Sequence, residues 1–375
     1  MKKPLNILMI ALHLDYRIHG GLSRHVYELC KALTKKGCHV YVSCMENDFM
    51  EIDNKILVPS LHIQEPILDF LSFNMNLPRK TRGYDIDVIH SQEDHGFVFA
   101  LMKKRPLIVT AHGSMKIVSP IRYHLSTYFR RLTNKYTFMK ADKIITVSKS
   151  VGKTIQNNFG IKEEKIVYIP NAVDVEKFYP DLDGEIIRKK YDVNGPLLVC
   201  VTRLDSGRFV EKLIPMVKVV KKEIPNFKLI IVGDGRSRRS LEKQCTRYGL
   251  NRNVILAGAK GDDELPYFYA AADLYVLPMV FAPARKEFSV LEAMASGKAV
   301  VYVNRMGPEN EEERITNCNP IAVDNDKDFA SSIIYLLQDE KKRKELGLVG
   351  RKAITECFSW EKIAEKTIQI YESII

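Results

Sequence analysis

Three basic residues stand close together after an apolar run in the second half of the chain. Residues 197–201 (LLVCV) form this run, and Arg203, Arg208 and Lys212 follow it. Cations at the carboxyl end of a strand suit a diphosphate, because arginine contacts two phosphate oxygens at once and lysine adds a point charge. A surface loop with solvated charges explains the same spacing, so both interpretations stay open at this point.

An acidic residue lies inside an otherwise apolar segment further on. Residues 287–296 predict a short helix that ends before Gly297, and Glu292 lies within it. Its carboxylate either accepts hydrogen bonds from a protein neighbour or binds the hydroxyls of a ribose. The start of this helix offers unbonded backbone N–H groups that favour a phosphate. These residues are Glu287, Phe288, Ser289 and Val290.

One histidine and two glycine motifs also follow predicted strands. His112 comes after residues 107–110, where a position at the carboxyl end of a strand favours function, although a lone histidine is more often structural. Gly20 and Gly21 precede a predicted helix and permit close approach to a phosphate, but a plain turn has the same sequence. The motif from Gly233 to Gly235 lacks the residues of a Walker loop or a dinucleotide fingerprint, which favours a tight turn.

Apolar runs alternate with amphipathic segments along both halves of the chain, and these elements position the residues above. We predict strands at residues 5–12, 39–44, 88–90, 107–110, 144–147, 167–169, 197–201, 228–232, 254–256, 273–277 and 299–303. We predict helices at 23–36, 119–140, after Ser148, at 212–222, at 287–296 and from 326 onward. The alternation predicts an α/β fold of two doubly wound Rossmann-like domains that face each other across a cleft, with ligands at the carboxyl ends of the strands.

Proline and glycine cluster between residues 170 and 196, where we place the boundary between the two domains. The last segment, residues 360–375, predicts an amphipathic helix whose apolar face carries isoleucines. These are Ile363, Ile368, Ile370 and Ile374.

The charge and cysteine patterns limit the class of protein. Of the net charge of +11, most lies in the first half, and residues 101–153 hold 12 basic residues against one acidic residue. Such a surface favours phosphates, anionic lipid or nucleic acid, unless it is only a solvated helix face. No RNA-binding or helix-turn-helix motif stands out, so we expect no nucleic-acid partner. The seven cysteines form no C-x-x-C pair, which argues against a disulfide framework or metal site and favours a reducing cytosol.

Ten short segments in this order resemble the retaining GT-B glycosyltransferases of family 4 (glycosyl transferases group 1). They span nearly the whole chain, and together they are specific although each is modest. The segments are Gly20–Gly21 with its helix, 109–113 (VTAHG), 145–148 (ITVS), 169–174 (IPNAVD), 201–204 (VTRL), 231–235 (IVGDG), 254–258 (VILAG), 272–278 (ADLYVLP), 291–298 (LEAMASGK) and 358–361 (FSWE).

The resemblance implies a role for several residues. By position, Glu292 matches the glutamate that holds the ribose, Arg203 the arginine that binds the diphosphate, and His112 the histidine that contacts the transferred sugar. Arg208 stands where the family has a lysine, with Lys212 as a second candidate for that role. Further donor-binding candidates are Gly20, Gly21, Gly233, Gly258, Lys260, Glu287, Phe288, Ser289 and Val290.

One position departs from the family pattern. The family has a second glutamate eight residues before Glu292, which grips the hydroxyls of the donor sugar, and here that position holds Ala284. Glu287 can substitute if the loop is shortened, or Arg285 faces the donor instead. The departure leaves the identity of the donor sugar open and weakens the case for activity.

The resemblance also implies an organisation. Residues 1–172 correspond to an acceptor-binding domain, 173–357 to a nucleotide-sugar-binding domain, and 358–375 to a helix that crosses back to the first domain. The implied activity is metal-independent transfer of a sugar from a nucleotide-diphosphate sugar, UDP-linked by expectation, with retention of anomeric configuration. No cofactor is implied, because the nucleotide sugar is a co-substrate.

Two alternative functions and one partner stay open. The first alternative is a sugar-nucleotide epimerase of the same fold, which turns over its substrate without an acceptor. The second is a catalytically impaired protein that binds nucleotide sugars. The acceptor is unidentified, with lipid-linked and phosphorylated molecules as the candidates. Peripheral contact with an anionic membrane is a hypothesis for the basic segment that contains Arg122, Arg130, Arg131 and Lys135.

Overall fold

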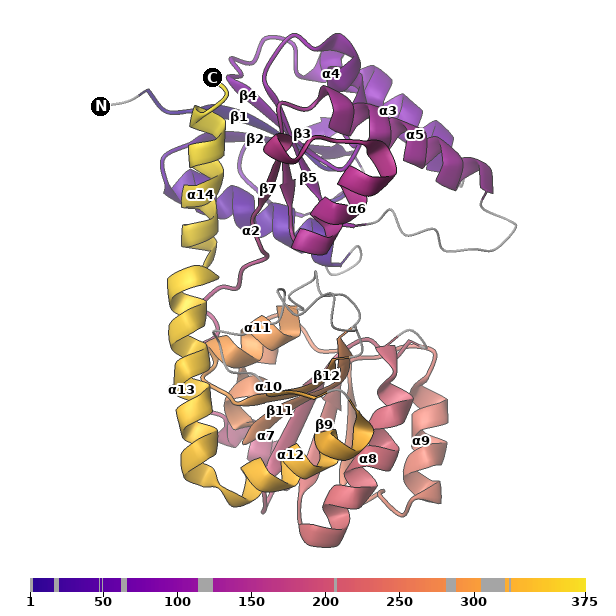
Figure 1. The fold of residues 1–375 in the computed structure, drawn as a ribbon, viewed down its shortest axis with the longest axis vertical. Helices are drawn as coiled ribbons and strands as arrows, with labels where there is room; N and C mark the ends of the chain where they lie inside the picture. The colour runs from indigo at the N-terminus through magenta and orange to yellow at the C-terminus, as the bar shows by residue number, and fades with distance from the viewer. Residues whose placement is uncertain are drawn as a thin grey trace. The chain divides into compact units, whose positions relative to one another are not determined.

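The computed structural model describes residues 3–16, 20–46, 48, 50–61, 66–113, 124–205, 208–280, 288–304, 321–323 and 325–375. The chain divides into two compact units (Figure 1). Unit 1 comprises Met1–Asn171 and Trp360–Ile375, and unit 2 comprises Ala172–Ser359. The chain therefore passes between the units twice, after Asn171 and after Ser359.

Within its described residues, unit 1 contains a seven-stranded sheet in the order β3-β2-β1-β4-β5-β6-β7, and every neighbouring pair is parallel. Chain order reverses between β1 and β4, which places the switch point of this sheet at their carboxyl ends. The strands are β1 (Asn6–Ile10), β2 (His39–Met45), β3 (Lys55–Val58), β4 (Val88–Gln92), β5 (Leu107–Ala111), β6 (Lys143–Thr146) and β7 (Ile166–Tyr168).

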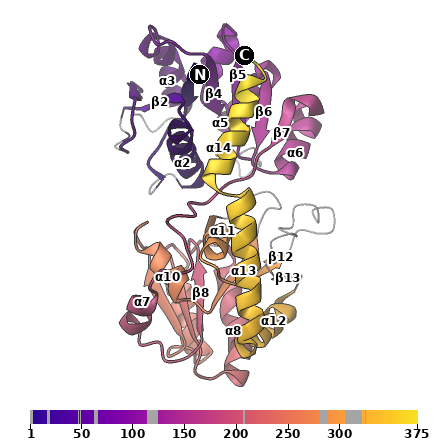
Figure 2. The ribbon, with the colours of Figure 1, turned by 90° about the vertical axis from the view of Figure 1, so that its left-hand side faces the viewer.

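The helices of unit 1 form two groups. Helices α3, α4 and α5 lie side by side, and α14 packs along α2 (Figures 1 and 2). Their bounds are α2 (Gly21–Lys35), α3 (Pro66–Lys80), α4 (Phe97–Met102), α5 (His124–Lys140), α6 (Lys149–Phe159), the 3-10 helix η2 (Glu163–Lys165) and α14 (Trp360–Glu372).

Unit 2 repeats the plan with a six-stranded parallel sheet among its described residues, in the order β10-β9-β8-β11-β12-β13. Its chain order reverses between β8 and β11, so its switch point lies at the carboxyl ends of these two strands. The strands are β8 (Leu197–Val201), β9 (Lys228–Val232), β10 (Val254–Gly258), β11 (Leu274–Val280), β12 (Val300–Asn304) and β13 (Ile321–Val323).

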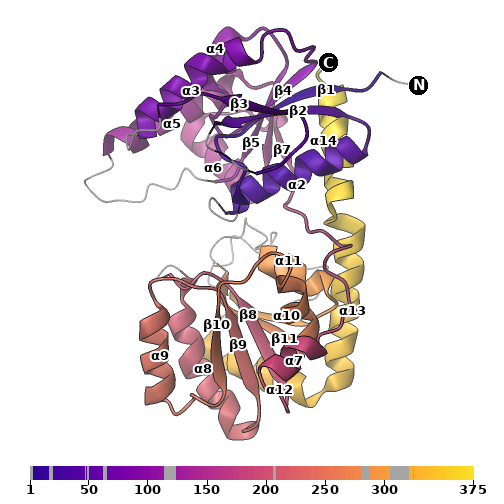
Figure 3. The same cartoon turned by 180° about the vertical axis from the view of Figure 1, so that it is seen from behind.

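Helices of unit 2 pack in two groups around this sheet. Helices α8, α9 and α12 form one group, and α7, α10, α11 and α13 form the other (Figure 3). Their bounds are α7 (Glu185–Lys190), α8 (Val210–Glu223), α9 (Arg238–Arg247), α10 (Leu265–Ala271), α11 (Phe288–Ala295), α12 (Asp326–Gln338) and α13 (Glu340–Cys357).

The central strands are buried because helices cover both faces of each sheet. All five residues of β1 and of β5 are buried, and so are the first four of β8. Continuous burial of this kind is typical of parallel sheets between helical layers. The prediction of two doubly wound parallel sheets is therefore confirmed.

Several elements differ from the prediction. Strands β3 and β13 and helices α3, α4, α7, α9 and α10 were not predicted, and all of them except α3 and α9 have seven residues or fewer. The predicted apolar face of the last helix is wrong. Of its four isoleucines only Ile363 is buried, and the buried face runs through Trp360, Ile363, Ala364, Thr367 and Tyr371 at helical spacing.

Two further facts concern the helices and the cysteines of the described residues. None of their helices is long and apolar enough to cross a bilayer. The cysteines among them, with Cys30, Cys44 and Cys200 deep in the two cores, are all free thiols.

Candidate functional site

The switch point of unit 2 gathers the residues of the predicted donor site. Arg203 lies two residues after β8, and its side chain is 74% exposed with Asp205 as a distant ion-pair partner at 3.8 Å. Arg208 follows in a turn in which its backbone N–H bonds to the Asp205 carbonyl at 2.8 Å. Lys212 lies in the first turn of α8, with its Nζ 5.4 Å from the centre of the Phe209 ring.

A buried tyrosine ties this edge to the start of α11. The Tyr275 hydroxyl donates a hydrogen bond to the carbonyl of Val201, the last residue of β8, at 3.2 Å. Ser289 in the first turn of α11 lies near the same hydroxyl, and burial raises the pKa of Tyr275 well above its usual value. The α11 N-terminus therefore lies beside the strand end that precedes Arg203. Its first turn contains Phe288, Ser289 and Val290 and holds no acidic residue.

Glu292 is buried within α11, with 2% of its surface exposed. Its Oε2 accepts a hydrogen bond from the Tyr269 hydroxyl at 2.6 Å. The Tyr269 ring packs against Tyr275 and Phe178, each at 5.6 Å between ring centres. The structure thus shows a carboxylate whose orientation is fixed by a protein partner, which is the first of the two interpretations drawn from the sequence. Whether it also holds a ribose stays a prediction.

The glycines of unit 2 have a packing role. A Cβ on Gly233 would lie 1.9 Å from the Thr202 carbonyl oxygen, and the φ of Gly233 is +138°. Gly233 also donates its N–H to the carbonyl of Gly258 at 2.9 Å, which joins the ends of β9 and β10. These contacts support the interpretation of this motif as a tight turn. Lys260 follows two residues after Gly258 and is half-buried.

At the switch point of unit 1, Gly20 precedes α2 with a φ of +78°. A Cβ there would meet nothing within 4 Å, so the glycine is required by the backbone conformation and not by space. No side chain caps α2, and its first turn, which begins at Gly21, holds no acidic residue. Unbonded N–H groups of this kind suit an anion.

His112 lies one strand away, just after β5. Its backbone N–H donates to Oε1 of Glu93 at 2.7 Å, and its Nε2 lies 2.7 Å from Oε1 of Gln92. Both partners lie at the carboxyl end of β4 and are buried, and Glu93 adopts a positive φ of 50°. The sequence analysis missed Gln92 and Glu93. The signal for them was the polar run of residues 90–95 (HSQEDH) directly after a predicted strand.

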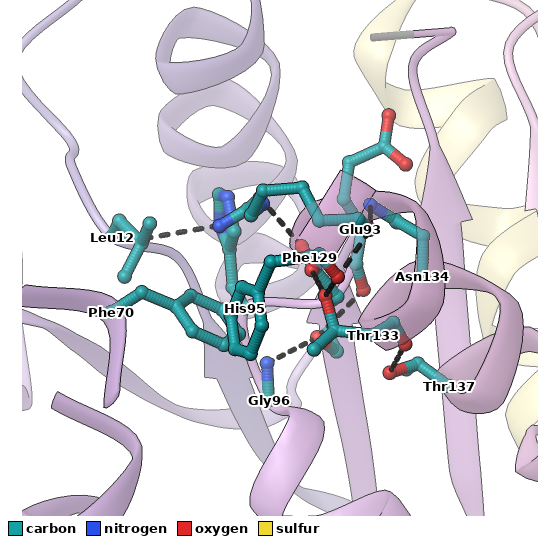
Figure 4. A network of polar contacts seen from close by, with 12 residues as sticks. Leu12, Phe70, Glu93, His95, Gly96, Phe129, Thr133, Asn134 and Thr137 are labelled. Atoms are coloured by element: carbon teal, nitrogen blue, oxygen red, sulfur yellow. Dashed lines mark hydrogen bonds and ion pairs between the residues drawn. The ribbon is translucent and has the colours of Figure 1, made fainter. Parts of the chain in front are cut away.

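The next residues of the same loop form a buried polar network (Figure 4). Asp94 is fully buried and pairs with Nη2 of Arg130 on α5 at 2.5 Å, and Thr133 also bonds its carboxylate. Burial raises the pKa of the Asp94 carboxyl, an effect that Arg130 only partly offsets. Nδ1 of His95 accepts the N–H of Leu12 at 3.2 Å, and burial holds the His95 pKa well below its usual value.

This network corrects the interpretation of one basic residue. Arg130 was assigned to a membrane-facing surface, but it lies against Asp94 with its guanidinium carbon 4.7 Å from the centre of the Phe70 ring. Arg131 and Lys135 are exposed, as that hypothesis requires. The predicted site residue Glu287 and the departure Ala284, together with Arg285 and Arg122, lie outside the described residues.

Comparison with known proteins identifies the family of the chain. The family model for Glycosyltransferase Family 4 matches residues 19–177, and the model for Glycosyl transferases group 1 matches residues 183–353. The chain belongs to the glycosyltransferases. The two matches together cover most of unit 1 and most of unit 2.

Individual relatives of this glycosyltransferase match between 60% and nearly all of the chain. An uncharacterized glycosyltransferase of Methanocaldococcus jannaschii is 28% identical over 98% of both chains. A GDP-mannose-dependent alpha-(1-6)-phosphatidylinositol monomannoside mannosyltransferase of Mycobacterium tuberculosis is 27% identical over 60% of each chain. The Anabaena protein HepE, solved in complex with UDP and glucose, shares the GT-B fold with a TM-score of 0.78 at 19% identity, over 98% of this chain and 100% of that one.

Within the described residues, no group of three or more histidine, cysteine, aspartate or glutamate side chains is placed to hold a metal ion. The described residues at the unit 2 edge of this glycosyltransferase include the cations Arg203, Arg208 and Lys212 and the backbone N–H groups at the start of α11. Such groups bind and neutralise phosphate oxygens.

Proposed function

We propose that this glycosyltransferase transfers a sugar from a nucleotide-diphosphate sugar to an acceptor with retention of anomeric configuration and without a metal ion. The observation that carries the proposal is the hydrogen bond from the Tyr275 hydroxyl on β11 to the Val201 carbonyl at the end of β8, which joins the two strands of the unit 2 switch point. Arg203 follows the first of these strands and α11 follows the second, and doubly wound sheets bind nucleotides at such switch points.

Each residue has a specific role in this proposal. Arg203 and Arg208 bind the diphosphate and neutralise the negative charge that develops as the nucleotide leaves, with Lys212 in support. The α11 N-terminus adds backbone N–H donors, and Glu292, oriented by Tyr269, binds the ribose. Removal of one preorganised donor of this type costs about 3 kcal/mol of transition-state stabilisation, a factor of about 100 in rate.

Unit 1 supplies the other groups. His112 contacts the transferred sugar, and the α2 N-terminus at Gly20 and Gly21 approaches the diphosphate. The leaving phosphate helps to deprotonate the acceptor on the same face of the sugar. No pair of carboxylates is required for this reaction, unlike in glycoside hydrolases.

The base of the nucleotide differs between the similar proteins. HepE was solved with UDP, whereas the mycobacterial relative is GDP-mannose-dependent. We propose a UDP-sugar as the donor and test it against the alternatives directly.

The first experiment is calorimetric titration of the protein with UDP-, GDP-, ADP- and dTDP-sugars and with the free diphosphates. We expect one nucleotide series to bind, with affinity lowered about tenfold or more in Arg203→Ala, because loss of a charge-assisted hydrogen bond costs about 1.5–3 kcal/mol. Arg252→Ala is the matched control, because Arg252 is exposed and precedes β10 at the opposite edge of the same sheet. Equal affinity in all three proteins, or no binding at all, would refute the proposed donor site.

Turnover assays separate the proposal from its alternatives. Consumption of the bound nucleotide sugar only when an acceptor extract is added supports transfer. Release of nucleotide and an altered sugar without acceptor supports an epimerase instead. Binding with no turnover under any acceptor supports a protein that has kept the donor site and lost catalysis.

We also propose that α5 contacts an anionic membrane, where a lipid-linked acceptor would be found. Tyr128, Leu132 and Met139 on α5 are 62%, 48% and 51% exposed, and Arg131 and Lys135 are exposed between them. These positions share one helix face, and apolar side chains flanked by cations fit the interface of an anionic bilayer.

Vesicle sedimentation tests this contact. We expect binding to vesicles that contain phosphatidylglycerol, weaker binding in high salt, and little binding to pure phosphatidylcholine. Leu132→Ser should weaken binding, whereas Leu348→Ser, at a position 67% exposed on α13 of unit 2, should not. Wild-type binding that is absent, or equal for both lipids, would remove the membrane from the proposal and leave donor binding untouched.

A further inference from the structure

His25 lies in the second turn of α2 and is the point where three distant parts of unit 1 meet. It is 2% exposed, and its Nδ1 lies 3.1 Å from Oδ1 of Asn171. Its ring meets the His112 ring edge-on, with 4.9 Å between centres and an interplanar angle of 80°. It meets the Trp360 ring in the same way, at 5.3 Å and 72°.

Two of these neighbours mark the places where the chain leaves and re-enters unit 1. Asn171 is the last residue of unit 1 before the first crossing, and Trp360 is the first residue after the second crossing. The crossing segments are bonded to each other just beyond, since the N–H of Val173 donates to the Phe358 carbonyl at 2.9 Å and Val173 forms a parallel bridge with Ser359. Both crossings therefore contact one side chain, and that side chain contacts His112.

We infer that His25 is a positioning residue, which orients the His112 ring according to the position of the two crossing segments. The inference rests on the proposed function of His112 as the group that contacts the transferred sugar. His25 itself acts only through His112, because its side chain is enclosed by protein.

Several neighbours constrain His112. Gln92 fixes the distance to one ring nitrogen, and the backbone bond to Glu93 fixes the main chain. The edge-on contact with His25 adds a constraint on the orientation of the ring plane.

The polar partner of His25 distinguishes positioning from simple filling of the core. A phenylalanine would fill a similar volume between His112 and Trp360, but it would lose the contact of Nδ1 with Asn171. Burial lowers the pKa of His25 to about 4, so the ring is neutral at pH 7 and its two nitrogens have distinct donor and acceptor roles. A shift of Asn171 then changes the position of the His25 ring, and through it His112.

The test uses the full-length protein with ¹⁵N-labelled histidine and three variants, His25→Phe, Asn171→Ala and the control His39→Phe. His39 is also paired with an asparagine, its Nδ1 lying 3.2 Å from Oδ1 of Asn6, but it is exposed at the start of β2. We expect the ring resonances of His112, assigned with His112→Ala, to shift in His25→Phe and in Asn171→Ala and to stay in place in His39→Phe.

Kinetics give the readout that loss of stability alone would not produce. We expect kcat to fall by about tenfold or more in His25→Phe and in Asn171→Ala, because small misplacements of a reacting group are costly, while the donor KM changes less than twofold. Unmoved His112 resonances in Asn171→Ala, or a kcat equal to that of the wild type in both variants, would overturn the inference. The resonances are measured in the free protein, so this arm decides the inference even if the wild type shows no transfer and the proposed function fails.

Discussion

The two sheets end in edges of opposite character. At the carboxyl ends of β4 and β5, polar groups are buried and bonded to one another, as in the pairs Asp94–Arg130 and Gln92–His112. At the carboxyl end of β8, Arg203 is largely exposed, and Glu292 is the buried polar group with a fixed partner. The unit 1 edge is therefore shaped by the protein itself, whereas the cations of unit 2 can be ordered by a bound anion.

This difference teaches which substitutions act on stability and which act on binding. A group that is preorganised by buried partners contributes its geometry before any ligand arrives, and its loss destabilises the fold. A solvated cation contributes mainly when it meets its ligand. The predictions below test that division.

The largest expected effect follows from breaking the Asp94–Arg130 pair. Arg130→Met leaves a fully buried carboxylate without its cation, and we expect the free energy of unfolding of unit 1 to fall by about 4 kcal/mol. Urea unfolding followed by tryptophan fluorescence measures it, because Trp360 is the single tryptophan of the chain and lies buried in unit 1.

The matched control is Arg131→Met, which removes an exposed cation from the neighbouring position of the same helix. Its effect should stay within about 0.5 kcal/mol. Equal stability of the two variants would show that the unit 1 edge does not depend on its buried network, and the comparison would fail.

The next largest effect is expected from acid, which should change the stability of the two units differently. All nine histidines lie between residues 13 and 124, so they belong to unit 1. Burial lowers the pKa of His25 to about 4 and of His90 to about 3, from a usual value of 6.5. As the pH falls below 6.5, the unfolded chain binds these protons and the folded chain does not. The free energy of unfolding of unit 1 therefore falls, by about 1.4 kcal/mol per pH unit for each ring.

Urea titrations at pH 7.5, 6 and 5 check this. The fluorescence transition of Trp360 should move to lower urea with each step below pH 6.5 and should be insensitive to pH above it. His90→Gln should reduce the slope against pH. An acid response confined to unit 2, seen by hydrogen exchange in its strands, would contradict the assignment.

The sequence predicts most central strands of both sheets well because they are apolar runs, whereas in β4 (VIHSQ) the predicted strand stops at His90. It does not predict β3, in which Leu57 is 42% exposed and the apolar run has three residues. It also misassigns the buried face of α14, where Tyr371 is buried with its hydroxyl 2.6 Å from Nδ1 of His90. The partner in that hydrogen bond, His90, lies 281 residues away along the chain, so no local sequence pattern predicts the contact.

The same limit applies to the site. Arg203 and Glu292 stand out because their neighbours in the sequence are apolar. His25 and Gln92 do not, because their importance comes from contact with His112, which lies 87 and 20 residues away along the chain. A resemblance to a family carries the residues of a shared motif, but contacts between motifs require coordinates.

A smaller effect is expected from the one fixed carboxylate of the unit 2 edge. Tyr269→Phe removes the hydroxyl that donates to Glu292, and we expect the free energy of unfolding of unit 2 to fall by about 2 kcal/mol. Donor affinity should fall with it, because Glu292 loses the bond that orients it. Hydrogen exchange in α11, followed by mass spectrometry, measures the first effect, and calorimetry measures the second.

Tyr335→Phe controls for the loss of a hydroxyl, since Tyr335 is 51% exposed on α12 of the same unit. Faster exchange in α11 for both variants would mean that the hydrogen bond from Tyr269 to Glu292 does not specifically stabilise α11. In that case the unit 2 edge would contain no preorganised group of the kind found in unit 1.

The smallest expected effect is the sharpest test of the comparison. Arg203→Ala should change the free energy of unfolding of unit 2 by no more than about 0.5 kcal/mol, because the side chain is 74% exposed and its ion pair with Asp205 is long. Calorimetric melting without ligand measures this, and a second melt with a saturating nucleotide diphosphate should raise the melting temperature of the wild type but not of the variant. If the variant melts at a lower temperature without ligand, Arg203 stabilises the folded state of unit 2. The prediction that this exposed side chain acts only when it binds a phosphate would then be wrong.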